Sequence, residues 1–144
     1  MPVITTLSEI IALYTAAGLL GAMAFFPTAV APVVFRALPP DAAGRFLRAL
    51  FPAYYAYVIT MSGVCCFALL LIANSWAVAA GAIALSTLAL RTVLVPRINA
   101  WRDADLEGET GAKEKFDAGH RASVIANVVQ MALAAALLWE TARL

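Results

Sequence analysis

Long stretches without a charged residue constrain this chain more than any other feature of its sequence. No Asp, Glu, Lys or Arg occurs between Glu9 and Arg36, between Arg48 and Arg91, or between Arg121 and Glu140. A water-soluble helix needs a polar face, and these stretches provide none. Each can cross a hydrocarbon core of about 30 Å, which takes about 20 helical residues, and the middle stretch can cross it twice. The sequence therefore predicts an integral membrane protein with four transmembrane helices.

Composition and charge argue against several other classes of protein. A formal net charge of +1 gives no basis for binding nucleic acid or an acidic soluble partner. Cys65 and Cys66 are adjacent in an apolar run, so they predict small buried side chains rather than a disulfide framework. The first apolar segment is long and follows Glu9 with no Lys or Arg before it. This favours a retained helix over a cleaved signal peptide.

The expected fold is all-α, an integral membrane four-helix bundle of up-down-up-down topology with its termini outside. One transmembrane domain is expected over residues 1–144. Its helices are predicted at about residues 7–35, 42–73, 76–100 and 116–141. Neither a soluble domain nor an internal repeat is apparent.

Local signals mark the start and the irregular points of these helices. Thr6 and Glu9 match a capping box at the start of the first helix. Pro27 and Pro32 predict a kink or an unwound stretch in its last third. Pro96 is expected to kink the third helix rather than to end it.

The basic residues predict the orientation of the bundle. Nine of the ten Lys and Arg lie in or beside the connections that follow the first and third helices: Arg36, Arg45, Arg48, Arg91, Arg97, Arg102, Lys113, Lys115 and Arg121. The other side has Arg143 alone. By the positive-inside rule, both of these connections face the cytoplasm and both termini face outward.

One arginine falls inside an expected span. Arg91 lies about five residues within the cytoplasmic end of the third helix, roughly 7 Å deep at 1.5 Å per residue. A charge at that depth costs a few kcal/mol or more, which makes it a candidate for a functional site. Arg91 either reaches the headgroups, pairs with Asp117, or faces inward and binds an anion, a carbonyl or a phenolic oxygen.

Polar side chains also recur along one face of the fourth helix. They are spaced by 3, 4 and 3 residues, which places them on an arc of about 80°: His120, Ser123, Asn127 and Gln130. Val124 and Val128 are expected on the opposite, apolar surface. Such a polar stripe either hydrogen-bonds to neighbouring helices or lines a cavity.

Further residues are expected to complete a crevice that faces the cytoplasm. Tyr14 and Thr28 share one face of the first helix, and Tyr57 belongs to an aromatic cluster where the second helix enters the bilayer. Basic and aromatic side chains would converge at the mouth of this crevice. The candidate ligand-binding residues are Arg91, His120, Arg121, Ser123, Asn127, Gln130, Tyr14 and Tyr57.

Metal or haem binding would depend on His120, the only histidine. Imidazole can serve as a proton relay, a metal ligand or a haem ligand. Soft donors for copper(I) could come from Met23, Met61, Met131 and the cysteine pair, although Met in an apolar helix more often fills space. Haem and copper are the cofactor alternatives.

Several motifs resemble those of the DUF4149 family, which shares its domain with the eukaryotic transmembrane protein 205 group. They are Phe26-Pro27 through Ala31-Pro32-Val33-Val34-Phe35, Pro96-Arg97-Ile98-Asn99, and Phe116-x3-His120-Arg121-x-Ser123-x3-Asn127. The resemblance implies a four-helix membrane protein and gives weight to the stripe on the fourth helix, but it supplies no reaction. A fainter similarity, in length and helix count, is to small membrane protoporphyrinogen oxidases, although the first helix here has no histidine.

Three functions fit these observations. The first is a carrier or resistance component that handles a small solute, ion or lipophilic ligand through the crevice, working as a homo-oligomer in a bacterial inner membrane. The second is a membrane-bound oxidoreductase, or another enzyme that binds haem or a quinone, with His120 as ligand or acid/base. The third is a structural subunit whose polar stripe joins helices.

Overall fold

Four long helical rods make up the fold of this computed structural model, which describes residues 2–144. In chain order the elements are α1 (Pro2–Phe25), η1 (Phe26–Val30), α2 (Ala31–Ala37), α3 (Pro40–Leu71), α4 (Ala77–Ala89), η2 (Leu90–Leu94), α5 (Val95–Leu106) and α6 (Ala112–Thr141). No strand occurs in this described part of the chain. The expected all-helical fold is confirmed.

All four rods are long and apolar enough to cross a membrane: Val3–Ala37, Pro40–Leu71, Ala77–Leu106 and Ala112–Thr141. Only a minority of the residues in each apolar window are buried inside the bundle. Large apolar side chains such as Phe67, Leu85 and Ile125 instead point outward and are more than 60% exposed. Water would penalise so much exposed apolar surface, whereas lipid tails solvate it. The chain is therefore a multi-pass membrane protein.

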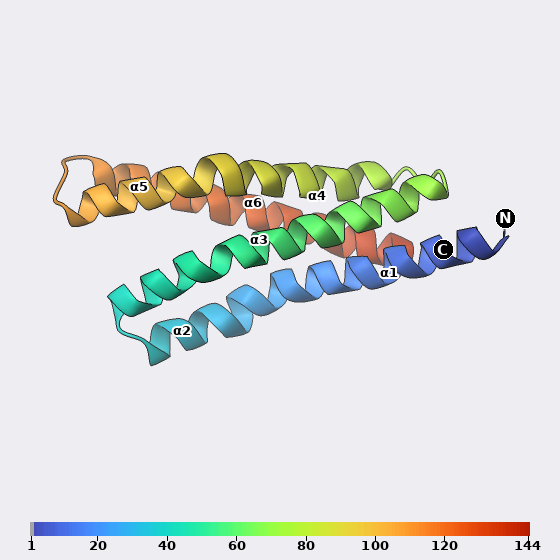
Figure 1. The fold of residues 1–144 in the computed structure, drawn as a ribbon, viewed down its shortest axis with the longest axis horizontal. Coiled ribbons are helices and arrows are strands. Elements are labelled where there is room, and N and C mark those ends of the chain that lie inside the picture. Colours follow the sequence, from blue (N-terminus) through green and yellow to red (C-terminus); the bar gives the residue numbers. More distant parts are fainter. Residues whose placement is uncertain (1) are drawn as a thin grey trace.

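Figure 1 shows how the rods are arranged. Both termini lie at one end of the bundle, and the connections α2–α3 and α5–α6 lie together at the other end. At the latter end α2 packs on α3, and α5 packs on α6. These two hairpins diverge there, so the bundle is wider at the end that carries nearly all of its basic residues.

The packed core occupies the half of the bundle nearer the termini. One buried cluster contains mostly alanines, with Cys65, Leu69 and Leu137, and contacts Trp76 at its edge. A second cluster lies further along the rods and contains Leu19, Met23, Val58, Ile83 and Ala134. Small residues at helix interfaces let the backbones approach closely, which is a common way to join membrane helices. The helices are therefore packed tightly in the half near the termini and lie further apart in the other half.

Two turns of π-helix interrupt the first and third rods. The backbone N–H of Ala31 bonds to the carbonyl of Phe26, and that of Val95 bonds to the carbonyl of Leu90. In both places the next residue is a proline, Pro32 or Pro96. A proline ring clashes with the carbonyl four residues earlier in a regular α-helix, and a wider turn relieves that clash. The irregularities predicted at these prolines are confirmed, and they are π turns within continuous rods.

The two π turns also share a local side-chain feature. Thr28 and Thr92 each lie four residues before the proline. Their hydroxyls donate to the carbonyls of Ala24 at 2.6 Å and Leu88 at 2.8 Å, respectively.

The rods extend further than hydrophobic length alone predicts. The first begins at Pro2, so Thr6 and Glu9 lie inside a helix and the predicted capping box is wrong. The third continues to Leu106, six residues past its predicted end, and the fourth starts at Ala112. Helices continue into water when their residues are good helix formers, while an estimate from bilayer thickness stops at the headgroups.

Candidate functional site

A cavity of about 240 Å³ lies between the two hairpins, in the wide half of the bundle. All four rods contribute to its walls: Met23, Phe26 and Pro27 from the first; Phe51, Tyr54 and Tyr55 from α3; Val95, Ile98 and Asn99 from the third; His120, Ser123, Val124, Asn127, Val128 and Met131 from α6. Among these described residues none is Asp, Glu, Lys or Arg. The cavity is therefore apolar, with a few uncharged polar groups.

One wall of the cavity is a cluster of aromatic rings. Phe26, from η1, lies 5.2 Å from the ring of Phe51 and 4.9 Å from that of Tyr54. Phe51 is stacked on Tyr55 with the ring centroids 5.6 Å apart. These contacts fall in the range in which aromatic rings stabilise one another beyond the area they bury. The π turn carries Phe26 and Pro27 into this wall, which links the irregular backbone to the cavity.

The facing wall comes from α6 and holds most of the polar groups. The hydroxyl of Ser123 donates to the carbonyl of His120 at 2.7 Å, and the amide of Asn127 donates to the carbonyl of Ser123 at 2.9 Å. The Asn127 side chain also faces the Tyr55 hydroxyl on the opposite wall. Ser123 and Asn127 therefore bond to their own helix and line the cavity, and Asn127 also reaches Tyr55 on α3.

His120 stands at the wide end of this wall. It lies seven residues from Asn127, about 10 Å along the helix at 1.5 Å per residue. Its ring is stacked on that of Phe116 at 5.9 Å, and the guanidinium of Arg102 lies over the Phe116 ring at 5.4 Å. The His120 side chain is exposed rather than buried. His120 is thus placed at the mouth of the cavity.

Gln130 ends the stripe in a different environment. It is only 5% exposed, and its amide donates to Ser86 at 2.7 Å and to Thr87 at 3.2 Å on α4. Its side-chain oxygen, Oε1, has no partner within residues 2–144. Gln130 therefore joins two helices and does not line the cavity. This separates it from the other three residues of the predicted stripe.

The positions of Val124 and Val128 show that the predicted apolar surface of α6 was wrong for these two residues. Both residues line the cavity, although they were expected on the opposite surface. The cavity occupies a broad arc of the helix because the hairpins diverge on either side of it. The polar arc is one part of that wall, and the two valines form another.

Four other predicted residues lie outside the cavity: Arg91, Arg121, Tyr14 and Tyr57. Arg91 is exposed in η2 and forms no ion pair within the described chain, while Asp117 pairs with Lys113 at 2.9 Å. The predicted pairing of Arg91 with Asp117 is therefore wrong. Arg91 lies near the middle of the third rod, 15 residues before Leu106, so reaching the headgroups, the first of the alternatives for this residue, would need its side chain to extend along the outside of the helix.

The two tyrosines outside the cavity have different surroundings. Tyr14 is 74% exposed on the lipid-facing side of α1. The hydroxyl of Tyr57 lies so near Gly18 that an added Cβ there would be 3.0 Å from it. Gly18 thus makes room for this tyrosine between the first two rods.

Phe26, Pro27 and Phe51 are cavity residues that the sequence did not single out as ligand-binding. Apolar rings in an apolar helix carry no signal of their own, because most such rings pack against lipid or core. Phe26 and Pro27 do begin one of the family motifs, and Asn99 ends another, Pro96-Arg97-Ile98-Asn99. All three residues line the cavity.

The potential donor atoms for a metal ion are divided among three places. No group of three or more His, Cys, Asp or Glu that could hold a metal occurs in the described part of the chain. Met23, Met61 and Met131 belong to or pack against the same buried cluster. His120 lies eleven residues from Met131, about 16 Å along the helix, and Cys65 belongs to the other cluster, near the termini.

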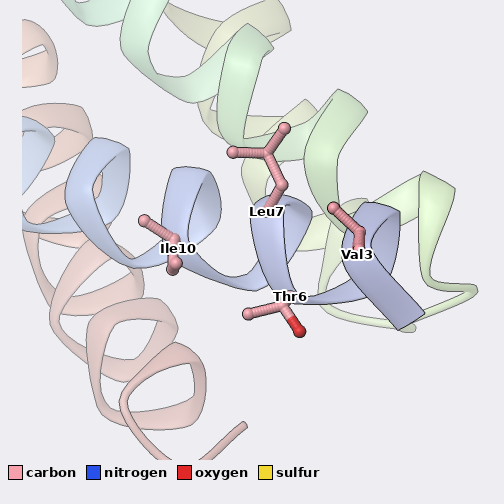
Figure 2. Close-up of a pocket in the computed structure, with 4 residues that line it drawn as sticks. All are labelled: Val3, Thr6, Leu7 and Ile10. Atoms are coloured by element: carbon pink, nitrogen blue, oxygen red, sulfur yellow. The ribbon is translucent and has the colours of Figure 1, made fainter.

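A second hollow, of about 380 Å³, lies at the start of α1. Figure 2 shows its four residues, Val3, Thr6, Leu7 and Ile10, along successive turns of that one helix. Val3, Leu7 and Ile10 are exposed and apolar. The hollow is an open groove on a lipid-facing helix, and no opposing wall from another element of residues 2–144 encloses it.

The fold and the cavity together define a small four-helix membrane protein with a largely apolar cavity between two hairpins. The chain belongs to the DUF4149 family, a domain of unknown function, whose family model matches residues 14–106. The match covers most of the first rod and all of the next two, and it ends before α6, so the run from Phe116 to Asn127 lies outside it. It names DUF4149 alone and does not extend to the transmembrane protein 205 group. No curated protein and no solved structure matches the chain.

Proposed function

We propose that this protein handles a small, uncharged, lipophilic molecule in the cavity between its hairpins, as a carrier or a resistance component. The observation that carries this proposal is the cavity itself: all four rods line it, and none of its described lining residues is Asp, Glu, Lys or Arg. A charged ligand would lose its hydration there without an opposite charge to compensate, whereas a lipophilic one would not. Of the ligand types considered, an inorganic ion therefore fits least well.

The size of the cavity sets the size of the ligand. An enclosed cavity of about 150 Å³ can hold benzene, and pockets for drug-sized ligands begin at about 300 Å³. A volume of about 240 Å³ lies between these values. It suits a molecule of one or two rings.

The position of the cavity suits exchange with the inner leaflet or the cytoplasm. The wide end has nine of the ten basic residues in or beside its connections. By the positive-inside rule this supports our proposal that the wide end faces the cytoplasm, in a bacterial inner membrane. Four helices are few for a carrier, and we include a homo-oligomer in the proposal.

Accumulation of small lipophilic inhibitors in cells tests this proposal. Cells that express the wild-type chain are expected to accumulate less of at least one uncharged one- or two-ring inhibitor than cells that carry the empty vector. Val128→Phe should remove this difference by filling the cavity, while Val129→Phe, on the next residue and outside the cavity, should preserve it. Equal accumulation in cells with wild-type protein and with empty vector, across the inhibitor panel and at equal expression, would contradict the proposal.

A membrane oxidoreductase is the second candidate, and the placement of His120 favours it. The imidazole stands in the wall at the mouth of the cavity, where it could exchange protons with water and with a ring compound inside. An absorbance scan of the purified protein with added haemin tests the haem version. If no Soret band that depends on His120 appears, the protein does not bind haem through this residue and the haem version is wrong.

A further inference from the structure

The two walls of the cavity differ in chemistry, and this difference selects among lipophilic ligands. The rings of Phe26, Phe51, Tyr54 and Tyr55 form one side, with neighbouring centroids 4.9 to 6.4 Å apart. Aromatic rings interact with one another more favourably than their buried area alone accounts for. A flat aromatic ring placed between this cluster and α6 would gain contacts that a saturated ring of equal size would not.

Tyr55 supplies a hydrogen-bond donor inside the cavity. It is only 4% exposed, yet it is one of the residues that line the hollow. The Asn127 side chain faces its hydroxyl, and the amide of that asparagine already donates to the carbonyl of Ser123. This asparagine is the one partner of the Tyr55 hydroxyl within residues 2–144. An amide NH2 has two N–H groups and a hydroxyl can accept and donate at once, so the hydroxyl can accept from Asn127 and donate its own proton to a ligand.

We infer that the cavity binds a planar, uncharged ring compound that carries a hydrogen-bond acceptor, such as a carbonyl oxygen or a ring nitrogen. The ring lies against the aromatic cluster, and the acceptor receives the proton of the Tyr55 hydroxyl. This inference rests on the proposed function and adds the class of ligand to it. It concerns binding only and includes no chemical step.

Three two-ring probes separate the features of this ligand. Quinoline is flat and has a ring nitrogen, naphthalene is flat and has no acceptor, and 1-decalone has a carbonyl on saturated rings. Binding of each is measured by equilibrium dialysis against the purified chain in lipid nanodiscs, in buffer where quinoline is uncharged. Protein-free nanodiscs of the same lipid correct for partition into the bilayer.

Quinoline is expected to bind most tightly. One hydrogen bond is worth about three- to tenfold in affinity over naphthalene, and aromatic contact about two- to tenfold over 1-decalone. Tyr55→Phe should reduce quinoline affinity to that of naphthalene and leave naphthalene binding unchanged. Tyr57→Phe, on the same helix but outside the cavity, should change neither.

The results distinguish failure of the ligand class from failure of the cavity. If 1-decalone binds as tightly as quinoline, or if Tyr55→Phe affects naphthalene and quinoline equally, the proposed class of ligand is wrong while the cavity still binds lipophilic molecules. If no probe binds above the protein-free nanodiscs, both this inference and the proposed function are contradicted. If Val128→Phe leaves the binding of every probe intact, the probes bind elsewhere and both are again contradicted.

Discussion

Arg48 and Asp103 form a two-bonded ion pair, at 2.7 and 3.1 Å, that ties the start of α3 to the end of α5. Arg48 also donates to the carbonyl of Asn99 at 3.3 Å, and Asn99 lines the cavity. The other two ion pairs of the described chain each lie within a single helix. The Arg48–Asp103 pair is therefore the one that bridges the two hairpins at their wide end.

Removing this ion pair should open the wide end of the cavity. We expect Arg48→Gln to raise severalfold the rate at which a water-soluble thiosulfonate modifies a cysteine placed at Ser123, with Cys65 and Cys66 replaced by alanine. High salt should raise the rate in the chain that keeps Arg48, because it screens exposed charges. Lys113→Gln, which removes an ion pair within α6, serves as the control. Equal rates in the Arg48→Gln and Lys113→Gln chains would show that the pair does not restrict access.

Adding a methyl group at Gly119 should push α5 away from α6. An added Cβ there would lie 2.7 Å from Cζ3 of Trp101 and 3.0 Å from Cγ1 of Ile98, which is too close for real contacts. We expect Gly119→Ala to lower the free energy of unfolding by about 1–3 kcal/mol, the usual effect of overpacking. Gly63→Ala meets no atom within 4 Å and should be neutral or slightly stabilising. Chemical unfolding in micelles measures both, and equal stabilities would contradict this packing.

The prolines after the π turns should lower the stability of the helices while they maintain the shape of the cavity. We expect Pro96→Ala to raise the unfolding temperature, because proline inside a helix costs up to about 3 kcal/mol relative to alanine. The same change should weaken quinoline binding, since a regular turn would rotate the residues on either side of η2 relative to one another. Pro40→Ala, at the first position of α3, should affect neither property much. Unchanged quinoline binding in Pro96→Ala would show that the π turn does not shape the ligand site.

Gln130 should act in helix association and not in ligand binding. Thr87→Val removes a hydroxyl that accepts from the Gln130 amide, and we expect it to destabilise the bundle by about 0.6–2 kcal/mol. Gln130→Leu removes the unpartnered Oε1 together with the amide donor, so its effect on stability should be smaller. Quinoline affinity should be the same in both variants. A large loss of quinoline affinity in Gln130→Leu would contradict this and show that Gln130 contributes to ligand binding.

The sequence predicted the membrane class of this chain well, because a water-soluble helix rarely lacks charge over a length that spans a bilayer. It also predicted that His120, Ser123 and Asn127 share a surface, since helical spacing fixes which residues lie on one face. It did not predict that Gln130 would meet Ser86 instead. That contact depends on where α4 approaches α6, which no pattern within one helix contains.

The aromatic wall and the position of Arg91 needed the three-dimensional structure. Phe26 and Phe51 lie on different rods, and their approach to each other depends on the π turn at η1. Arg91 lies within the second π turn, where it is exposed and does not line the cavity. The sequence showed where prolines disturb a helix, but it could not give the rotation that results.

If the cavity between the hairpins is the ligand site, filling it should weaken ligand binding, and a matched pair of valine variants tests this. Val128 lines the cavity, while Val129, the next residue, is 60% exposed and lies outside it. Quinoline binding to Val128→Phe, Val129→Phe and wild-type protein is measured in nanodiscs at equal protein concentration. We predict that Val128→Phe lowers affinity at least tenfold and that Val129→Phe leaves it unchanged. Equal affinities for the two variants would contradict the claim.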